Sequence, residues 1–388
     1  MSRPLDGLIV LDFTRVFSGP FTTLMLSDMG ARVLKVEHPD GGDDSRQFGP
    51  FSGGTSGYFE TVNRGKQSLT LDYRCGAGQA VLRELSRSVD VVVENFRPGQ
   101  MARYGLDYAT LSQSNPRLVY ASISGFGQDS PYRERGCYDI VAQAMSGLMS
   151  LTGTPDSPMK TGPSLADAIS GLTAATGLLA ALWSAERTGR GAHVDIAMVD
   201  AVFACLENTL SEYSVTQTVP TRTGNADTVL APFDSFKTAD SWLVIGVGND
   251  RLWGRLARLL SLEDDSRFLT NHGRVEHYDA LQPMIQTWCE GQTTSALLSC
   301  LHAEGIPAGA IRDIEDLSHD AHFEARGMLM PLVLSEGSQL IVPGSAFHIS
   351  GAERPHPVRA PRLGEHTESI LREFGVEMGL EGGRQRLS

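Results

Sequence analysis

The alternation of short apolar segments with helical segments is the feature that most constrains the fold of this chain. Segments rich in Val, Ile and Leu, each long enough for one strand, lie at residues 8–13, 31–37, 68–72, 89–96 and 117–125. Patterns typical of helices occur between them at residues 21–29, 78–86 and 108–112. Strands that are joined through helices pair in parallel, with right-handed crossovers. This part of the chain therefore predicts an α/β fold built on a parallel sheet.

The pattern changes further along the chain. Two long helices are expected at residues 139–151 and 168–186, followed by a strand at 192–198 and a helix near 199–213. The segment "SVTQTVPTRTGNADTVLAPFDS" then has the composition of an irregular linker. A second unit follows, with a strand in "SWLVIGVG" and helices near residues 250–260, 279–290 and 294–304. A domain boundary in the linker is therefore predicted.

Composition excludes several classes of function. A net charge of −13 argues against a nucleic-acid or anionic-membrane partner, because those partners attract basic surfaces. The five cysteines form no Cys-x-x-Cys pair, which fits a reducing compartment and predicts neither a disulfide framework nor a zinc site. The N-terminus lacks a signal-peptide core, and the most apolar helical stretch, residues 171–183, is too short to span a bilayer. We therefore expect a soluble cytoplasmic protein.

Familiar catalytic motifs are missing. "GVGNDR" has two of the three glycines of a dinucleotide fingerprint, and "NRGKQS" lacks the first glycine and the final Ser or Thr of a P-loop. The ten histidines show no pair with the spacing of a zinc hydrolase, so no metal is expected. "GPSLAD" lacks the second glycine of a nucleophile elbow. We therefore interpret both glycine motifs as turns after strands.

Other features suit a phosphorylated ligand. Ser18 and Gly19 precede Pro20 at the start of a predicted helix, whose first N–H groups are suited to an anion. The candidate phosphate-binding side chains are Arg64, Lys66, Arg74, Arg97 and Arg103. An ordinary helix start and scattered surface charges would look the same. In "GPSLADAIS", Asp167 precedes a long Ala- and Gly-rich helix, and the residues alone favour a role as helix N-cap.

Taken in order, the segments of this chain resemble the class III CoA-transferase family, which includes formyl-CoA transferase, carnitine CoA-transferase and the α-methylacyl-CoA racemases. The matching blocks are "LDGLIVLDFTRVFSGP", "GARVLKVEHP", "NRGKQSLTLD", "DVVVENFRPGQMARYGLDY", "NPRLVYASISGFGQ", "YDIVAQAMSGLMSLTG", "TGRGAHVDIAMVDA" and "RLGEHTESIL". They run along nearly the whole chain, and their order and spacing carry the resemblance.

The resemblance implies the architecture. It predicts a Rossmann-like large domain with a parallel sheet and a smaller α/β domain, in a chain that forms an open ring. The implied parts are the large domain at residues 1–198, a linker at 199–225, the small domain at 226–320, and a return linker with the C-terminal part of the large domain at 321–388. Members of the family form homodimers in which the two rings interlock, so we expect such a homodimer here.

The family's catalytic aspartate falls on Asp167. The resemblance implies that this carboxylate attacks the thioester of an acyl-CoA, giving a mixed anhydride and then an aspartyl-CoA thioester, from which an acceptor acid takes the CoA. The CoA thioester is thus a substrate, and no tightly bound cofactor or metal is expected. Helix N–H groups beside Asp167 would keep the carboxylate ionised, as a nucleophile requires. The backbone near Ser18 or in "GVGN" would stabilise the oxyanion.

The resemblance also places the CoA site. Its implied residues are Val16, Phe17 and Ser18 near the pantetheine, His38, Leu71 and Arg74 at the nucleotide end, and Asn95, Phe96 and Arg103 beside it. Arg74 and Arg103 would contact phosphates, whereas Phe96 fits a core position equally well. Tyr138 and Asp139 would line the acyl pocket.

Two departures from the family pattern bear on function. Tyr138 stands where the racemases carry a histidine, and a phenol is a poor group for exchanging a proton at the α-carbon. Phe17 stands where formyl-CoA transferase has glutamine, which puts the oxalate and formyl specificity in doubt.

We expect succinyl-CoA as donor and a C4 or C5 dicarboxylate such as itaconate, mesaconate or malate as acceptor, bound through Arg15, Arg46 or Lys160. The alternatives are a 2-methylacyl-CoA racemase and a non-catalytic CoA-binding protein.

Overall fold

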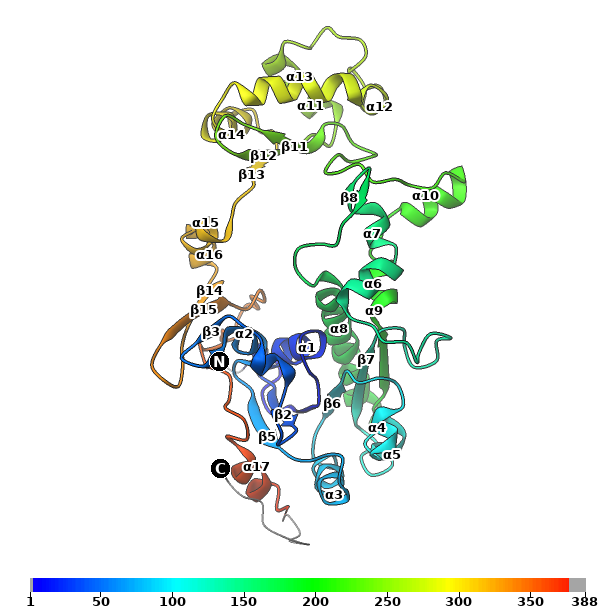
Figure 1. The fold of residues 1–388 in the computed structure, drawn as a ribbon, viewed down its shortest axis with the longest axis vertical. Helices are drawn as coiled ribbons and strands as arrows, with labels where there is room; N and C mark the ends of the chain where they lie inside the picture. The colour runs from blue at the N-terminus through cyan, green and yellow to red at the C-terminus, as the bar shows by residue number, and fades with distance from the viewer. Residues whose placement is uncertain (1–2, 377–388) are drawn as a thin grey trace. The chain divides into compact units, whose positions relative to one another are not determined.

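The computed structural model describes residues 3–376 of the chain, which divides into two compact units (Figure 1). The first unit comprises the chain up to Leu148, Lys160–Glu212 and the chain from Ala321 onward. The second unit comprises Met149–Met159 and Tyr213–Asp320. This division assigns residues 199–212 of the predicted linker to the first unit and residues 149–159 to the second. Of the predicted C-terminal part, residues 377–388 lie outside the described residues.

A parallel sheet of six strands forms the first unit, which confirms the predicted α/β fold. Its strands are β1 (Ile9–Asp12), β2 (Arg32–Glu37), β5 (Gln67–Thr70), β6 (Val91–Glu94), β7 (Val119–Ser124) and β10 (His193–Ala197). Their order across the sheet is β10-β7-β6-β1-β2-β5. The chain therefore starts in the middle, builds outward on one side, crosses back and builds outward on the other, which is the order of a Rossmann fold.

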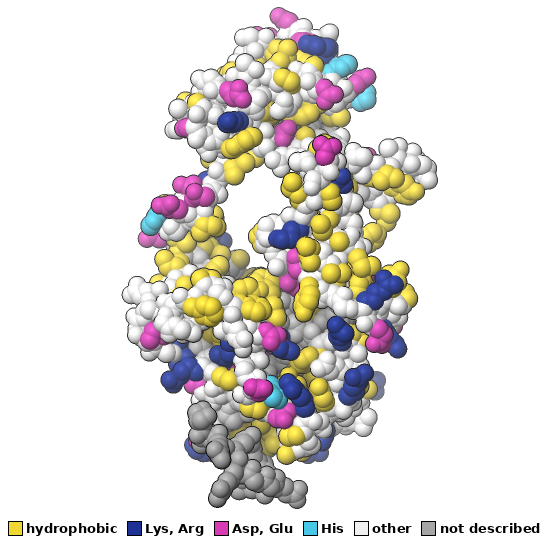
Figure 2. Space-filling view, viewed as in Figure 1, with side chains coloured by type: hydrophobic (Ala, Val, Ile, Leu, Met, Phe, Trp, Pro, Cys, Tyr) yellow, Lys and Arg dark blue, Asp and Glu magenta, His cyan; other side chains and the backbone are white. Residues whose placement is uncertain are grey.

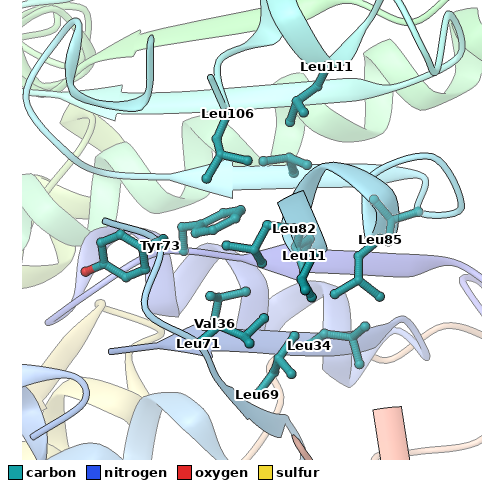
Figure 3. Packing of buried hydrophobic residues seen from close by; sticks show 14 of the residues in the cluster. Leu11, Leu34, Val36, Leu69, Leu71, Tyr73, Leu82, Leu85, Leu106 and Leu111 are labelled. Carbon is teal, nitrogen blue, oxygen red and sulfur yellow. The ribbon is translucent and has the colours of Figure 1, made fainter. Parts of the chain in front are cut away.

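Helices cover both faces of this sheet. On one face lie α1 (Ser18–Asp28), α6 (Asp139–Met145), α8 (Leu165–Thr188) and α9 (Met198–Phe203). On the other lie α3 (Gly76–Leu85), α4 (Gln100–Arg103), α5 (Tyr108–Leu111) and α17 (Thr367–Glu373). Figure 3 shows Leu11, Leu34 and Leu69 of three neighbouring strands packed against Leu82 and Leu85 of α3. The central strands are buried on both faces, which explains why β1 and β6 read as continuous apolar runs.

Helix α8 is longer than the sequence predicted. It begins at Leu165 instead of residue 168 and ends at Thr188, where Gly189 takes the left-handed conformation that ends many helices. By length and composition it passes the test for a membrane span, so the expectation that the apolar stretch is too short was wrong. The helix nevertheless packs against α1, α9, β7 and β10, and core helices of soluble proteins pass the same test.

Other local predictions also needed correction. The helix expected near residues 199–213 breaks into α9 and α10 (Thr209–Thr216). The sequence pattern did not show several short elements of the first unit: η1 (Asp44–Gln47), the hairpin β3–β4 (Phe51–Ser52 and Thr55–Ser56) and α2 (Gly57–Asn63). The second unit gains the hairpin β8–β9 (Gly153–Thr154 and Ser157–Pro158). All are too short to set up a clear hydrophobic period.

The second unit is a small α/β arrangement. Its antiparallel sheet has the strands β11 (Phe233–Lys237), β12 (Trp242–Gly246) and β13 (Ala308–Ala310). Its helices are α11 (Asp250–Leu260), α12 (Asn271–Glu276), α13 (Tyr278–Glu290), α14 (Thr294–Ala303) and α15 (Ile314–Ser318). The "GVGNDR" motif is a turn from β12 into α11, where the Asn249 side chain accepts a hydrogen bond from Leu252 N. Its glycines therefore serve a turn after a strand.

The end of the chain returns to the first unit. It forms α16 (Ala321–Ala325), the hairpin β14–β15 (Leu329–Val333 and Gln339–Pro343) and α17. The Thr367 hydroxyl accepts a hydrogen bond from Thr70 N at 2.9 Å, and His366 N donates to Ser68 O at 3.0 Å. These bonds tie the start of α17 to β5, the edge strand of the sheet.

Candidate active site

The turn from β1 into α1 lies at the point where the strand order reverses. β1 pairs with β2 on one side and with β6 on the other, and the chain crosses over on opposite sides of it. In open α/β sheets, ligands bind in the crevice at the carboxyl ends of the strands beside such a reversal. Residues 13–17 form this turn, and a small cavity beside it is lined by Thr14, Arg15, His38, Gly42, Asp43 and Tyr73.

The first turn of α1 is packed unusually closely. A Cβ atom on Gly19 would lie 2.3 Å from Thr14 Cγ2, so no side chain fits at this position. One on Gly171 of α8 would lie 2.8 Å from Ser18 O, and the Thr22 hydroxyl donates to Gly171 O at 3.1 Å. The small residues at these positions bring the first turn of α1 against the second turn of α8.

Asp167 lies in the first turn of α8 but does not cap it. Ser164 is the N-cap residue, and its side chain makes no capping hydrogen bond. Instead, Asp139 of α6 accepts hydrogen bonds at Oδ1 from Ala166 N at 2.8 Å and Asp167 N at 3.3 Å. The N-cap role that the residues alone favoured for Asp167 is therefore filled by Asp139, from a different helix.

Asp139 is itself held in place by a buried amide. Gln143, which is fully buried, donates from Nε2 to Asp139 Oδ2 at 2.7 Å. The side-chain oxygen Oε1 of Gln143 accepts a hydrogen bond from Thr161 N at 3.0 Å. A chain of hydrogen bonds thus links α6 to the segment before α8, and it fixes the backbone that carries Asp167.

The environment of Asp167 favours its neutral form. Burial, followed by the charge of Asp139, raises the pKa of Asp167 to about 7. The sequence had predicted the opposite direction, on the argument that helix N–H groups stabilise the carboxylate. That prediction was wrong because the side chain is largely buried, and because Asp139 takes those N–H groups and adds a like charge. The side chain therefore titrates near neutral pH, where a nucleophile or general base is useful.

Aromatic side chains lie beside the first turn of α1. The rings of Phe17 and Phe21 stack with their centroids 5.4 Å apart, and Tyr58 meets Phe17 edge-on at 6.3 Å. Burial and the charges of Asp167, Asp43 and Asp139 raise the pKa of Tyr58 to about 12, so Tyr58 is a neutral phenol. Tyr138, by contrast, is 80% exposed. An apolar wall with one neutral hydroxyl suits an acyl group.

The residues predicted for the nucleotide end of CoA come together around Tyr73. Its ring lies 5.9 Å from His38, 5.9 Å from Phe96 and 5.7 Å from Tyr104, measured between centroids. Arg74 and Arg103, which adjoin this cluster in sequence, are exposed. Leu71 and Phe96 are buried and belong to the hydrophobic core beneath it. The structure thus brings the predicted segments to one place, with two arginines at its rim.

Asn95 has both of its amide groups engaged within the chain. Its Oδ1 accepts from Arg15 N and its Nδ2 donates to Arg15 O, both at 2.8 Å. It therefore clamps the backbone of the β1–α1 turn. His38 is also partly engaged, because its Nε2 lies 3.3 Å from Asp72 Oδ1.

Several basic residues that the sequence offered as ligands are turned inward. Arg64 forms a buried ion pair with Asp28, and Lys66 is buried against Asp12 at 3.1 Å. Arg46 donates bidentate hydrogen bonds to the Glu37 carboxylate, and its guanidinium group lies over the Phe59 ring. Charges that are neutralised in this way are not available to a phosphate or a carboxylate. Arg15, whose side chain is 38% exposed, and Lys160 remain as candidates, although Arg15 pairs with Asp44.

Within residues 3–376 no group of three or more His, Cys, Asp or Glu side chains is placed to hold an ion.

Comparison with known proteins identifies the family. The sequence profile of CoA-transferase family III matches residues 5–367. The chain belongs to this family. It is 41% identical over 379 residues to the acetyl-CoA:oxalate CoA-transferase of Acetobacter aceti, with 96% of each chain covered. It is 39% identical over 384 residues to the succinate–glutarate CoA-transferase of Agrobacterium fabrum, again with 96% of each covered.

A solved structure supports the same conclusion. The fold matches the crystal structure of a CAIB/BAIF family protein from Brucella suis with a TM-score of 0.85 and 38% sequence identity. The match covers 96% of this chain and 100% of that one. The predicted family is therefore confirmed, and the chain is an enzyme of the CoA-transferase class.

Sequence reasoning missed some residues of this family III site. Gln143 and Tyr58 gave no signal, because an isolated Gln or Tyr in a helical pattern is most often a surface or core residue. Asp43 lies in the segment "GGDDSR", which reads as an exposed acidic turn. In the structure Asp43 is buried and bonded to Val16 N. Such roles arise from contacts between segments far apart in sequence.

Removal of the Asp139 charge should change the pH at which Asp167 ionises. The Asp139→Asn variant of this family III enzyme keeps an oxygen acceptor for the α8 amides but removes the negative charge. We expect the pKa of Asp167 to fall, because a like charge no longer opposes its ionisation. Under the proposal below that the Asp167 carboxylate attacks the acyl-CoA, the rate of that attack should then reach its plateau at a lower pH.

Single-turnover rates with an acyl-CoA between pH 5 and 9 would measure this shift. Asp279→Asn, on α13 of the second unit, is the control and should keep the wild-type profile. An unchanged midpoint in Asp139→Asn would show that Asp139 does not set the ionisation of Asp167.

Proposed function

We propose that this enzyme moves coenzyme A from an acyl-CoA donor to a dicarboxylic acid through covalent intermediates on Asp167. The observation that carries the proposal is the half-buried Asp167 carboxyl group, held in the first turn of α8, about one turn before Gly171, which contacts the first turn of α1. Coenzyme A enters and leaves as part of the substrates, and no tightly bound cofactor or metal takes part.

The first step is an attack of the Asp167 carboxylate on the thioester carbonyl carbon of the donor. A carbon–oxygen bond forms, the carbon–sulfur bond breaks, and the CoA thiolate leaves, which gives a mixed anhydride. A carboxyl group with a pKa of about 7 is partly ionised at neutral pH, so the nucleophile is present without a separate general base.

In the second step the thiolate attacks the aspartyl carbonyl carbon, and the donor acid leaves as a carboxylate. The resulting aspartyl-CoA thioester reacts with the acceptor acid by the same two steps in reverse. This covalent relay conserves the free energy of the thioester, which hydrolysis would release. Tetrahedral oxyanions form in each step, and the first backbone N–H groups of α1 are the proposed donors to them.

The acyl groups are proposed from the chemistry of the pocket and of the relatives. Succinyl-CoA is the proposed donor, and a C4 or C5 dicarboxylate such as itaconate, mesaconate, malate or glutarate is the proposed acceptor. The two relatives above are named for oxalate and for succinate and glutarate, all of which are dicarboxylates. Arg15 and Lys160 are the proposed partners of the distal carboxylate. Phe17 and Tyr58 form the apolar wall beside it.

The racemase alternative receives no support from the site. Proton exchange at the α-carbon needs two groups that titrate near neutral pH on opposite sides of that carbon. Asp167 is one such group, but the position of the second is occupied by Tyr138, which is 80% exposed.

The covalent mechanism predicts a mass change on one peptide. After mixing with succinyl-CoA alone, the peptide that contains Asp167 should carry CoA or a succinyl group, and a dicarboxylate acceptor should discharge it. Asp167→Asn and Asp167→Ala should lose the adduct and the transferase activity by at least about 1000-fold, because no carboxylate nucleophile remains. Peptide mass spectrometry with steady-state assays makes the measurement. Transfer at the wild-type rate by Asp167→Ala would contradict the mechanism.

If the exposed arginines Arg74 and Arg103 bind the phosphates of CoA, their loss should weaken the binding of acyl-CoA. Arg103→Ala should raise the acyl-CoA KM by about 3- to 10-fold with little change in kcat, because a charge-assisted contact to a phosphate is lost from both ground and transition states. The increase should shrink at high salt, since the arginine is exposed. Arg87→Ala, a surface residue paired with Glu84, is the control. Equal acyl-CoA KM values for the Arg103→Ala and Arg87→Ala variants would show that Arg103 does not bind the substrate.

A homodimer is proposed from the surface of the chain. Hydrophobic side chains are exposed over α6 and α10 (Figure 2), including Ile140, Met145 and Leu210, and Trp183 of α8 is 67% exposed. Exposed apolar surface of this kind marks an interaction site. Sedimentation equilibrium should therefore give twice the chain mass of 41.9 kDa, and a monomer at micromolar concentration would contradict the proposal.

The proposed compartment remains the cytoplasm, in agreement with five free cysteines.

A further inference from the structure

Val16, in the turn from β1 to α1, has a backbone conformation that valine rarely adopts. Its φ angle is 67°, in the left-handed region. A β-branched side chain clashes with its own backbone there, so this conformation costs free energy and persists only where surrounding contacts impose it. The next residue, Phe17, is also irregular, with φ −134° and ψ −62°. The chain therefore makes a sharp, strained turn directly before the first turn of α1.

Asp43 holds the strained residue from outside the turn. Its Oδ1 accepts a hydrogen bond from Val16 N at 3.1 Å. The same oxygen accepts from Ser45 N at 2.9 Å and Ser45 Oγ at 2.7 Å, and Asp43 N donates to Glu37 Oε2 at 3.1 Å. These bonds leave the carboxylate with little freedom to follow Val16 if the turn relaxed.

Lys35 anchors Asp43 from beneath. Its Nζ lies 2.8 Å from Asp43 Oδ2, and neither side chain is more than 1% exposed. Lys35 Nζ also donates to Thr14 O at 2.8 Å. Asn95 clamps both backbone groups of Arg15. Three consecutive residues of the turn are thus fixed by side chains that come from β2, from the segment after β2 and from the end of β6.

We propose that Asp43, held by Lys35, is a positioning residue that keeps Val16 in its left-handed conformation and so fixes the first turn of α1 for acyl-CoA. This inference rests on the proposed function, because that function makes the first turn of α1 part of the site. Asp43 acts through the backbone of Val16 and does not itself touch the reacting atoms.

A double-mutant cycle between Asp43 and Val16 tests the inference. Glycine adopts positive φ angles without a Cβ clash, so Val16→Gly removes the need for a residue that imposes the turn. In the wild-type background, Asp43→Ala should raise the acyl-CoA KM by about tenfold. In the Val16→Gly background, the same Asp43→Ala change should raise it by less than about threefold. A merely structural role of Asp43 would give the same factor in both backgrounds.

Asp28→Ala is the matched control. Asp28 is also a buried carboxylate in an ion pair, but its partner is Arg64 and not the turn. It should lower the thermal midpoint, and Val16→Gly should not change its effect on KM. If Asp43→Ala leaves Lys35 uncompensated and prevents folding, the cycle is run with Lys35→Met and Asp43→Ala together, since replacing both partners of a buried pair is tolerated better than removing one.

The outcomes separate this inference from the proposed function. Equal KM factors in the two backgrounds, in an enzyme whose wild-type form transfers CoA, would overturn the positioning role. If the wild-type chain transfers no CoA, the proposed function fails. The same cycle is then measured with the dissociation constant of coenzyme A by calorimetry, where a smaller factor in the Val16→Gly background still supports the inference and an equal factor overturns it.

Discussion

The site depends on charges that are buried beneath the carboxyl end of β1. Asp12, Lys35, Asp43 and Lys66 are each less than 4% exposed. Burial alone would raise the pKa of Asp12, but Lys66 and Lys35 outweigh it and hold that pKa below its ordinary value. Burial lowers the pKa of Lys66 to about 8 in spite of Asp12. Buried pairs of this kind contribute little net stability, yet losing one partner is costly, so the arrangement admits few alternatives. It thereby fixes one conformation of the β1–α1 turn.

The parallel sheet could be predicted from the sequence because its strands are buried on both faces. Val91, Val92 and Val93 give β6 a continuous apolar run, as expected of a strand that is buried on both faces. The break between α9 and α10 could not be predicted, since residues 199–213 form a nearly continuous helical pattern. The short helix α2 was missed for the opposite reason, because seven residues are too few for a hydrophobic period. Long elements that pack against the core can therefore be predicted from the sequence, whereas short elements that depend on tertiary contacts cannot.

The site was predicted in part, and the errors have a common cause. The residues alone placed Asp167 at the head of a helix, and the structure places it in the first turn of α8. Spacing, however, could not show that Asp167 is largely buried, or that Asp139 of another helix takes the amides that Asp167 was expected to bind. The predicted direction of the pKa change was therefore wrong. Arg64 and Lys66 read as ligands for phosphate because their buried partners lie 36 and 54 residues away. Val16, a β-branched residue, gives no hint of a left-handed turn.

The relation between Asp139 and Asp167 suggests why a site of this kind would keep two carboxyl groups together. As a free carboxylate, Asp167 bears the combined penalty of burial and of repulsion from Asp139. As an anhydride or a thioester, the same side chain carries no charge, so both penalties disappear. In the proposed cycle the environment therefore destabilises the free enzyme relative to its covalent intermediates, while Asp139 continues to hold the backbone of α8 in place. One fixed charge would then serve both to position the nucleophile and to favour its acylation.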